Sequence, residues 1–186
     1  MSGPRGFTGT RVDDLRSRPR IRAEPVDPAL FRDSMSRWAT GVTVVTTSDE
    51  EGRHHGFTAN SFTAVSLVPP MVLVCLDRVA NCLGAFAASP RLAVHVLRHD
   101  QEELAVRFSR KEADKFAGAV VEDGVADVPL LAGALARLEC QVTDRVWAGD
   151  HLILIAEVCR AEVGRPEAAD GEPLVYYRQA FHRLGS

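Results

Sequence analysis

Two pairs of β-type segments stand out in the pattern of apolar and polar positions along the chain. Residues 41–48 alternate Val with Thr, an acidic turn follows at 49–53, and residues 54–62 provide a return strand. Residues 134–149 and 150–163 are two longer stretches of the same kind, joined through Gly149-Asp150. A period of two with turn residues between the runs predicts two antiparallel hairpins.

Short helical segments and further apolar runs surround these hairpins. Asp27-Pro28 supplies an N-cap and a first helical residue. The apolar residues that follow at helical spacing are Leu30, Phe31, Met35 and Trp38, and Gly41 is expected to close the helix. The remaining predicted strands are 69–78, 91–97 and 173–178, and the remaining predicted helices are 79–89 and 100–110.

About six strands with short helices between them predict a mainly β protein with added α, built as an antiparallel barrel. A doubly wound parallel sheet needs regular strand-helix alternation with glycine-rich turns, which the C-terminal half lacks. Residues 1–26 hold Gly, Pro and Arg without an apolar period. We therefore expect a flexible Arg-rich arm over 1–26 and one folded domain over 27–186.

Composition agrees with a single globular domain, since 46% of the 186 residues are hydrophobic and 25% are charged. The formal net charge is −3, but residues 1–22 carry six Arg and two Asp, so the body is mildly acidic. An acidic body argues against nucleic-acid binding. The sequence has no run of about 20 apolar residues and no signal-peptide core, so we expect a cytoplasmic protein without a membrane segment.

Several kinds of site have no motif to support them. The four cysteines show no metal spacing. His95 and His99 are four residues apart, the helical spacing of a metal pair, but His95 lies in the predicted strand 91–97, where that spacing does not bring the two rings together. No metal site is therefore expected there. The chain has no G-x-S-x-G, P-loop or H-E-x-x-H motif, which disfavours hydrolysis.

The densest polar segment, Thr58 to Ser66, lies where the return strand leaves the first predicted hairpin, and it holds Asn60, one of only two Asn in the chain. Its small and hydrogen-bonding residues suit the edge of a flavin ring or of another heterocycle. The equally open alternative is that these side chains satisfy backbone groups at a turn.

Two weaker candidates come from a predicted helix start and from the second hairpin turn. Asn81 lies near Arg78 where free N–H groups and the helix dipole favour a phosphate, unless Asn81 only caps the helix. His151 follows Asp150 at the hairpin turn and is suited to bind a carboxamide or to carry a proton. A purely structural histidine is the alternative.

Seven segments, taken in order, resemble the flavin reductase-like, FMN-binding split-barrel family, the short-chain NAD(P)H:flavin oxidoreductases that serve two-component monooxygenases. They are ALFRDSMSRWATGVTVVTT, GFTANSFTAVSLVPPMVLVCLDR, FA..RLAVHVL, LAVRFS..EADKFAG, PLLAGALARLEC, GDHLILIAEV and PLVYYRQAF, and they span about residues 27–184. The resemblance implies a homodimeric, six-stranded antiparallel split barrel with short flanking helices. The chain departs from the family pattern at His95, where Asn is frequent, and at Ala80 and Cys82, where Ser or Thr is common.

The resemblance also implies an activity and a set of site residues. The protein would pass hydride from NADH, rather than NADPH, to FMN or FAD, with FMN favoured, and supply reduced flavin to a partner monooxygenase. The implied flavin contacts are Thr40, Gly41, Thr58, Ala59, Asn60 and Ser61, with Ser66, Arg78, Asn81 and Cys82 at the phosphate end. His151 would orient the nicotinamide, with Tyr176, Tyr177 and Arg178 on the same side.

Two other functions fit the same residues. One is a flavoprotein oxidase or oxygenase that holds FMN tightly and acts on its own substrate. The other is a non-catalytic flavin- or haem-binding redox module.

Overall fold

A computed structural model of the chain describes residues 24–111, 114–125, 127–164 and 171–184. Within these ranges the helices are α2 Pro28–Ser36, α3 Leu83–Ala88 and α4 Glu102–Ser109, with a short 3-10 helix at His99–Gln101. The strands are β1 Thr40–Gly41, β2 Thr43–Ser48, β3 His54–Ala59, β4 Thr63–Leu67, β5 Pro70–Asp77, β6 Arg91–Val96, β7 Val121–Asp123, β8 Pro129–Leu131, β9 Ala136–Ala148, β10 His151–Val163, β11 Val175–Tyr177 and β12 Ala180–His182.

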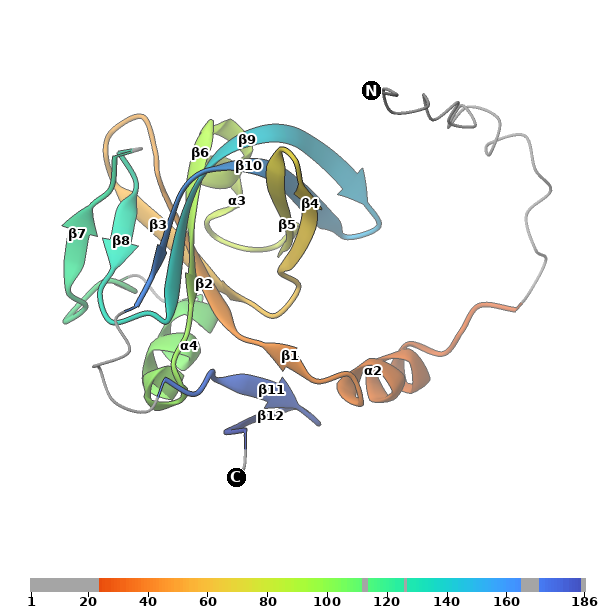
Figure 1. Ribbon diagram of the computed structural model, residues 1–186. Coiled ribbons are helices and arrows are strands. Elements are labelled where there is room, and N and C mark those ends of the chain that lie inside the picture. Colours follow the sequence, from red (N-terminus) through yellow and green to blue (C-terminus); the bar gives the residue numbers. More distant parts are fainter. Residues whose placement is uncertain (1–23, 112–113, 126, 165–170, 185–186) are drawn as a thin grey trace, which may run out of the picture.

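A seven-stranded antiparallel sheet in the order β3-β2-β6-β9-β10-β5-β4 forms the body of the molecule. The sheet curls into an open barrel (Figure 1). β3 and β4 are consecutive in the chain but form opposite edges of this sheet. The barrel is therefore split between them, and a small sheet of β1, β11 and β12 lies outside it (Figure 1).

Two groups of apolar side chains hold the barrel and its helices together. The first fills the barrel, where Phe86 of α3 meets Phe57 of β3 edge to face, with 4.9 Å between the ring centroids. The second packs α4 against the barrel through Phe108. Gly56 allows this approach, because a Cβ there would lie only 2.6 Å from the Phe108 ring. Full burial of each such aromatic side chain contributes roughly 1.5–3 kcal/mol.

Both predicted hairpins are confirmed. β2 and β3 pair antiparallel with Thr46 opposite Gly56. β9 and β10 pair along their length and meet at a turn, where Gly149 takes a φ of 61° that favours glycine. The predicted helix start is also confirmed, since the Asp27 side chain accepts a hydrogen bond from the Ala29 N–H at 3.0 Å.

Other boundaries predicted from the sequence were wrong. Gly41 does not close the first helix, which ends at Ser36, but belongs to β1 and pairs with Val175. The predicted helix over 79–89 shortens to α3, because residues 79–82 form a turn. The Thr58–Ser66 segment hides the start of β4, so the sheet has seven strands rather than about six. The predicted arm lies almost wholly outside the described residues.

Within the described ranges, no helix combines the length and apolar character that a membrane-spanning helix needs.

A fully buried histidine ties three strands together. His95 on β6 hydrogen-bonds the Val44 carbonyl through Nδ1 at 3.0 Å and accepts the Leu131 N–H at Nε2, also at 3.0 Å. These partners require a neutral ring protonated on Nδ1. Burial lowers the pKa of His95 from 6.5 to about 4.

This histidine makes the fold sensitive to acid. Below pH 6.5 the unfolded chain binds a proton at His95 that the folded chain excludes, so stability falls by about 1.4 kcal/mol per pH unit down to about pH 4. Chemical denaturation of wild type and His95→Gln between pH 7 and pH 4 checks this. We expect a shallower pH slope in His95→Gln and an unchanged slope in the exposed-residue control His54→Gln; equal slopes in all three would contradict it.

Candidate active site

A cleft of about 280 Å³ opens where the barrel is split. One side comes from the end of β3 and the chain after it, another from the end of β5 and the turn before α3, and a third from the end of α4 and the chain after it. The lining residues are Phe57, Thr58, Ala59, Asn60, Ser61, Cys75, Leu76, Asp77, Val79, Ala80, Asn81, Cys82, Phe108, Ser109, Arg110, Lys111, Lys115 and His151.

The segment after β3 is fastened in place by its own hydroxyl groups. Thr58 Oγ1 donates to the Ala105 carbonyl of α4 at 2.6 Å. Ser61 Oγ bonds the carbonyl and the N–H of Cys75 on β5, at 3.2 and 3.1 Å. These two side chains thus satisfy backbone groups, as the alternative interpretation of the sequence held, while the Asn60 side chain is exposed at the cleft.

Asn81 and Cys82 line the cleft at the turn before α3, yet neither acts as a side-chain cap. Asn81 Nδ2 donates to the Lys111 carbonyl at 2.7 Å, so this amide joins two sides of the cleft. Cys82 is the N-cap residue of α3 and makes no side-chain capping bond. Its thiol is buried, and burial raises its pKa, so the thiol stays protonated near neutral pH.

Three cations, Arg110, Lys111 and Lys115, line the α4 side of the cleft. Lys115 Nζ donates to the Gly56 and Phe108 carbonyls, each at 3.0 Å, and so fixes β3 to the end of α4. Burial lowers the pKa of Lys115 below its usual value. Because an ammonium group has three N–H donors, one stays available after these two bonds.

These cations were missed by the sequence interpretation, which placed the phosphate contacts near Asn81 instead. A signal was present in the composition, because Lys111 and Lys115 are the only two lysines against 20 arginines. The same scarcity drew attention to the two Asn, and both of those line the cleft.

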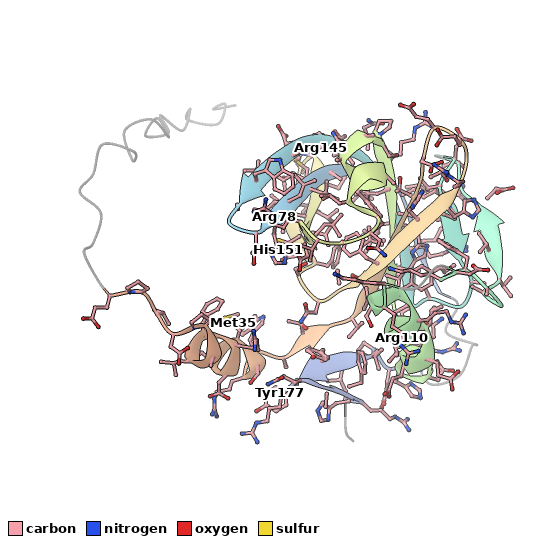
Figure 2. The ribbon with its side chains drawn as sticks, turned by 180° about the vertical axis from the view of Figure 1, so that it is seen from behind. Met35, Arg78, Arg110, Arg145, His151 and Tyr177 are labelled. Carbon is pink, nitrogen blue, oxygen red and sulfur yellow. The ribbon has the colours of Figure 1, made fainter. Side chains whose placement is uncertain are left out.

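His151 stands at the start of β10, opposite Asp77 of β5. Its Nδ1 lies 2.7 Å from Oδ1 of Asp150, and the side chain is 42% exposed. Figure 2 shows His151 beside Arg78 at the end of the β9–β10 hairpin, with Arg110 on the α4 side of the molecule.

The other residues named from the sequence lie elsewhere in this chain. Thr40, Tyr176 and Tyr177 belong to the small outer sheet, where Thr40 pairs with Tyr176, and Arg178 forms the β11–β12 turn with a φ of 49°. Ser66 is on β4, opposite Met71, and Arg78 is exposed beside the cleft without lining it. The chain by itself therefore brings together Thr58, Ala59, Asn60, Ser61, Asn81, Cys82 and His151, and leaves Thr40, Gly41, Ser66, Arg78, Tyr176, Tyr177 and Arg178 outside.

The arrangement suits a flat, anionic ligand. Small residues such as Ala59 and Ala80 leave room beside the backbone, Asn60 offers an amide, and the cations lie toward one end. Among the described residues, no group of three or more His, Cys, Asp or Glu side chains is placed to hold a metal ion.

Comparison with known proteins indicates which class of flat, anionic ligand the cleft is related to. The family model described as "Flavin reductase like domain" matches residues 35–185. The chain belongs to this family. It is accordingly an oxidoreductase, and the mainly antiparallel fold is that of the flavin reductase split barrels.

Two curated relatives match along most of their length. The actinorhodin polyketide dimerase of Streptomyces coelicolor is 45% identical, over 86% of this chain and 88% of the relative. The NADH:riboflavin 5'-phosphate oxidoreductase of Streptomyces pristinaespiralis is 42% identical, over 84% of this chain and 88% of the relative.

Solved structures agree with this. The nitrilotriacetate monooxygenase component B of Mycobacterium thermoresistibile is 36% identical with a TM-score of 0.80, covering 88% of this chain and 89% of that one. The NADH:FAD oxidoreductase SgcE6 of Streptomyces globisporus C-1027, solved with NAD and FAD fragments, is 37% identical with a TM-score of 0.78, covering 88% and 98%.

Proposed function

We propose that the protein is an NADH:flavin oxidoreductase that reduces FMN or FAD and supplies the reduced flavin to a partner monooxygenase. The observation that carries the proposal is the cleft at the split of the barrel, which joins Asn60, the three cations and His151 in a member of the flavin reductase family. The relatives named as flavin oxidoreductases or monooxygenase components favour this function over a tight-binding oxidase or a non-catalytic module.

The flavin ring would lie against residues 58–61. Because the Thr58 and Ser61 hydroxyls are already bonded within the protein, Asn60 and the local backbone are the groups left to meet the polar edge of the ring. A bound flavin supplies the redox chemistry by taking up hydride from the nicotinamide. The protein's part is to hold both rings, keep water out and place dipoles toward the charge that develops on the flavin.

The phosphate end of the flavin would meet Arg110, Lys111 and Lys115 rather than Arg78 and Ser66. Arg110, Lys111 and Lys115 line the cleft, whereas Arg78 and Ser66 do not. A charge-assisted hydrogen bond to a phosphate is roughly twice as strong as a neutral one. Within this proposal FMN is preferred to FAD, in line with the relative named NADH:riboflavin 5'-phosphate oxidoreductase.

His151 would orient the nicotinamide of NADH rather than transfer a proton. It lies at the β5 and β10 end of the cleft, where a second ring would meet a flavin bound along residues 58–61. The relatives named as NADH oxidoreductases support NADH as the donor, and a cytoplasmic location is part of the same proposal.

A second copy of the chain would cover helix α2 in a homodimer. The helix has no buried residues, and its apolar side chains Leu30, Phe31 and Met35 are 51–60% exposed, with Trp38 just beyond it at 70%. Figure 1 shows α2 standing away from the barrel. A contiguous apolar stripe of this kind marks an interaction surface, and pairing would bring further residues toward a cleft that is small for two ring systems.

The activity is tested by steady-state oxidation of NADH and NADPH with FMN, FAD and riboflavin supplied separately. We expect flavin-dependent oxidation, faster with NADH than with NADPH, and with the lowest KM for FMN. Flavin that stays bound through dialysis would favour the oxidase, and the absence of NADH or NADPH consumption with every flavin would favour the non-catalytic module.

The phosphate contacts are tested by comparing the affinity for FMN with that for riboflavin, which lacks the phosphate. Losing one charge-assisted bond in Arg110→Met or Lys115→Met should weaken FMN binding roughly 10- to 100-fold and leave riboflavin binding unchanged.

Lys115→Met also removes the hydrogen bonds that join β3 to the end of α4, so a loss of FMN binding in this variant could come from a change in the fold. Arg110→Met removes no such bond and therefore tests ligand binding alone. Arg183→Met removes a cation that does not line the cleft, and this variant should bind FMN like wild type. Equal weakening for FMN and riboflavin in Arg110→Met would contradict the assignment, as would unchanged affinity for both.

The homodimer is tested by light scattering of wild type and the double variant Phe31→Glu, Met35→Glu. We expect wild type at twice the 20.3 kDa chain mass and the variant at one chain mass, because four charges would be buried in the dimer. Arg32→Gln on the same helix should stay dimeric. A monomeric wild type, or a dimeric double variant, would overturn the proposal.

A further inference from the structure

The turn between β9 and β10 holds Asp150 in a fixed place. Gly149 provides the left-handed residue that the turn needs, with a φ of 61°. The Asp150 carbonyl accepts the Arg78 N–H at 2.9 Å, which joins the turn to the end of β5. These contacts hold the Asp150 backbone, and its carboxylate, on a side chain that is 78% exposed, lies 2.7 Å from Nδ1 of His151.

The contact between Asp150 and His151 has a defined hydrogen-bond direction. The hydrogen bond to His151 holds the pKa of Asp150 below its usual value, and the charge of Arg78 acts in the same direction. An ionised carboxylate only accepts hydrogen bonds, so the proton in this contact belongs to Nδ1 of His151. In a neutral imidazole the second nitrogen then carries no proton and is an acceptor.

Two other charged groups lie near His151, and neither substitutes for Asp150. Asp77 is opposite His151 in the sheet, and its Oδ1 accepts the Val79 N–H at 3.0 Å, whereas Asp150 is the carboxylate in contact with the His151 ring. Arg78 is exposed, and its guanidinium has no acceptor atom, so it cannot accept a hydrogen bond from the Nδ1–H of the ring.

We propose that Asp150 is a positioning residue that keeps neutral His151 protonated on Nδ1, so that Nε2 offers the cleft a hydrogen-bond acceptor for the carboxamide N–H of the nicotinamide. This rests on the proposed function, in which His151 meets NADH. The recognition is specific in one respect, because an acceptor selects the amide N–H of the carboxamide and gains nothing from its carbonyl.

The first test reads the tautomer in the free protein. Nitrogen-15 chemical shifts of the His151 ring show which nitrogen carries the proton, and they need no substrate. We expect Nδ1–H in wild type and a shift toward Nε2–H in Asp150→Asn, whose amide can donate to Nδ1. Asp144→Asn, on the exposed side of the same hairpin, should keep the wild-type tautomer. Nε2–H in wild type, or no change in Asp150→Asn, would overturn the proposal.

The second test uses the reduced dinucleotide in which an acetyl group replaces the carboxamide, so that the carbonyl stays and the N–H is lost. The measured quantity is the kcat/KM for NADH divided by the kcat/KM for the analogue. We expect this ratio to be about tenfold larger in wild type than in Asp150→Asn, because one such hydrogen bond supplies about that factor. The KM for flavin should be the same in both proteins. Asp144→Asn should match wild type.

The outcomes separate the two proposals. If wild type oxidises neither NADH nor the analogue, the proposed function fails, whatever the tautomer. If wild type oxidises NADH and its discrimination equals that of Asp150→Asn, the proposed function stands and the role given to Asp150 is overturned. A His151→Ala variant with full discrimination would overturn it in the same way.

Discussion

Between β3 and β4 the chain leaves one edge of the sheet and returns as the other, and the Ser61 hydroxyl fastens this crossing to both backbone groups of Cys75. The two strands are neighbours in the chain yet do not pair with each other in the sheet, so the barrel has an opening with fixed sides. Residues from β3, β5 and the start of α3 face that opening because they lie at the ends of elements that the sheet cannot close. The site is thus a consequence of the topology before any particular side chain is considered.

The same region shows how one side chain can stabilise the fold and serve a ligand. Lys115 bonds a strand carbonyl and a helix-end carbonyl, and the second contact places a cation at the negative end of the α4 dipole. Partial burial makes the ammonium costly to hold, and the two carbonyls offset that cost only in part. An anion bound beside Lys115 would offset the rest of this desolvation cost. Ligand binding and the contact between Lys115 and α4 would then stabilise each other.

Local patterns were enough to predict much of the fold. The two hairpins and the start of α2 follow from alternation, turn residues and an N-cap, all of which act over a few residues. β4 was missed because its five residues are almost all exposed and show no buried face, so they become a strand only by pairing with β5. The residues of the site were harder to predict because they too depend on contacts between distant parts of the chain. Arg78 is close to Asn81 in the sequence, whereas Lys111 comes into contact with Asn81 only when the chain folds. The family assignment came from resemblance over many segments, which no single motif supplied.

The Asn81–Lys111 contact also bears on how a ligand leaves the cleft. It links two exposed residues on different sides of the cleft through one hydrogen bond between an amide and a carbonyl. A bond of this kind contributes about 1 kcal/mol net, roughly a fivefold preference for the joined state. Thermal motion therefore breaks this hydrogen bond readily, and the bond does little to slow a ligand that enters or leaves the cleft. So weak a link fits the proposed function, in which flavin is a substrate that binds and leaves in each catalytic cycle, better than it fits a flavin held as a permanent prosthetic group.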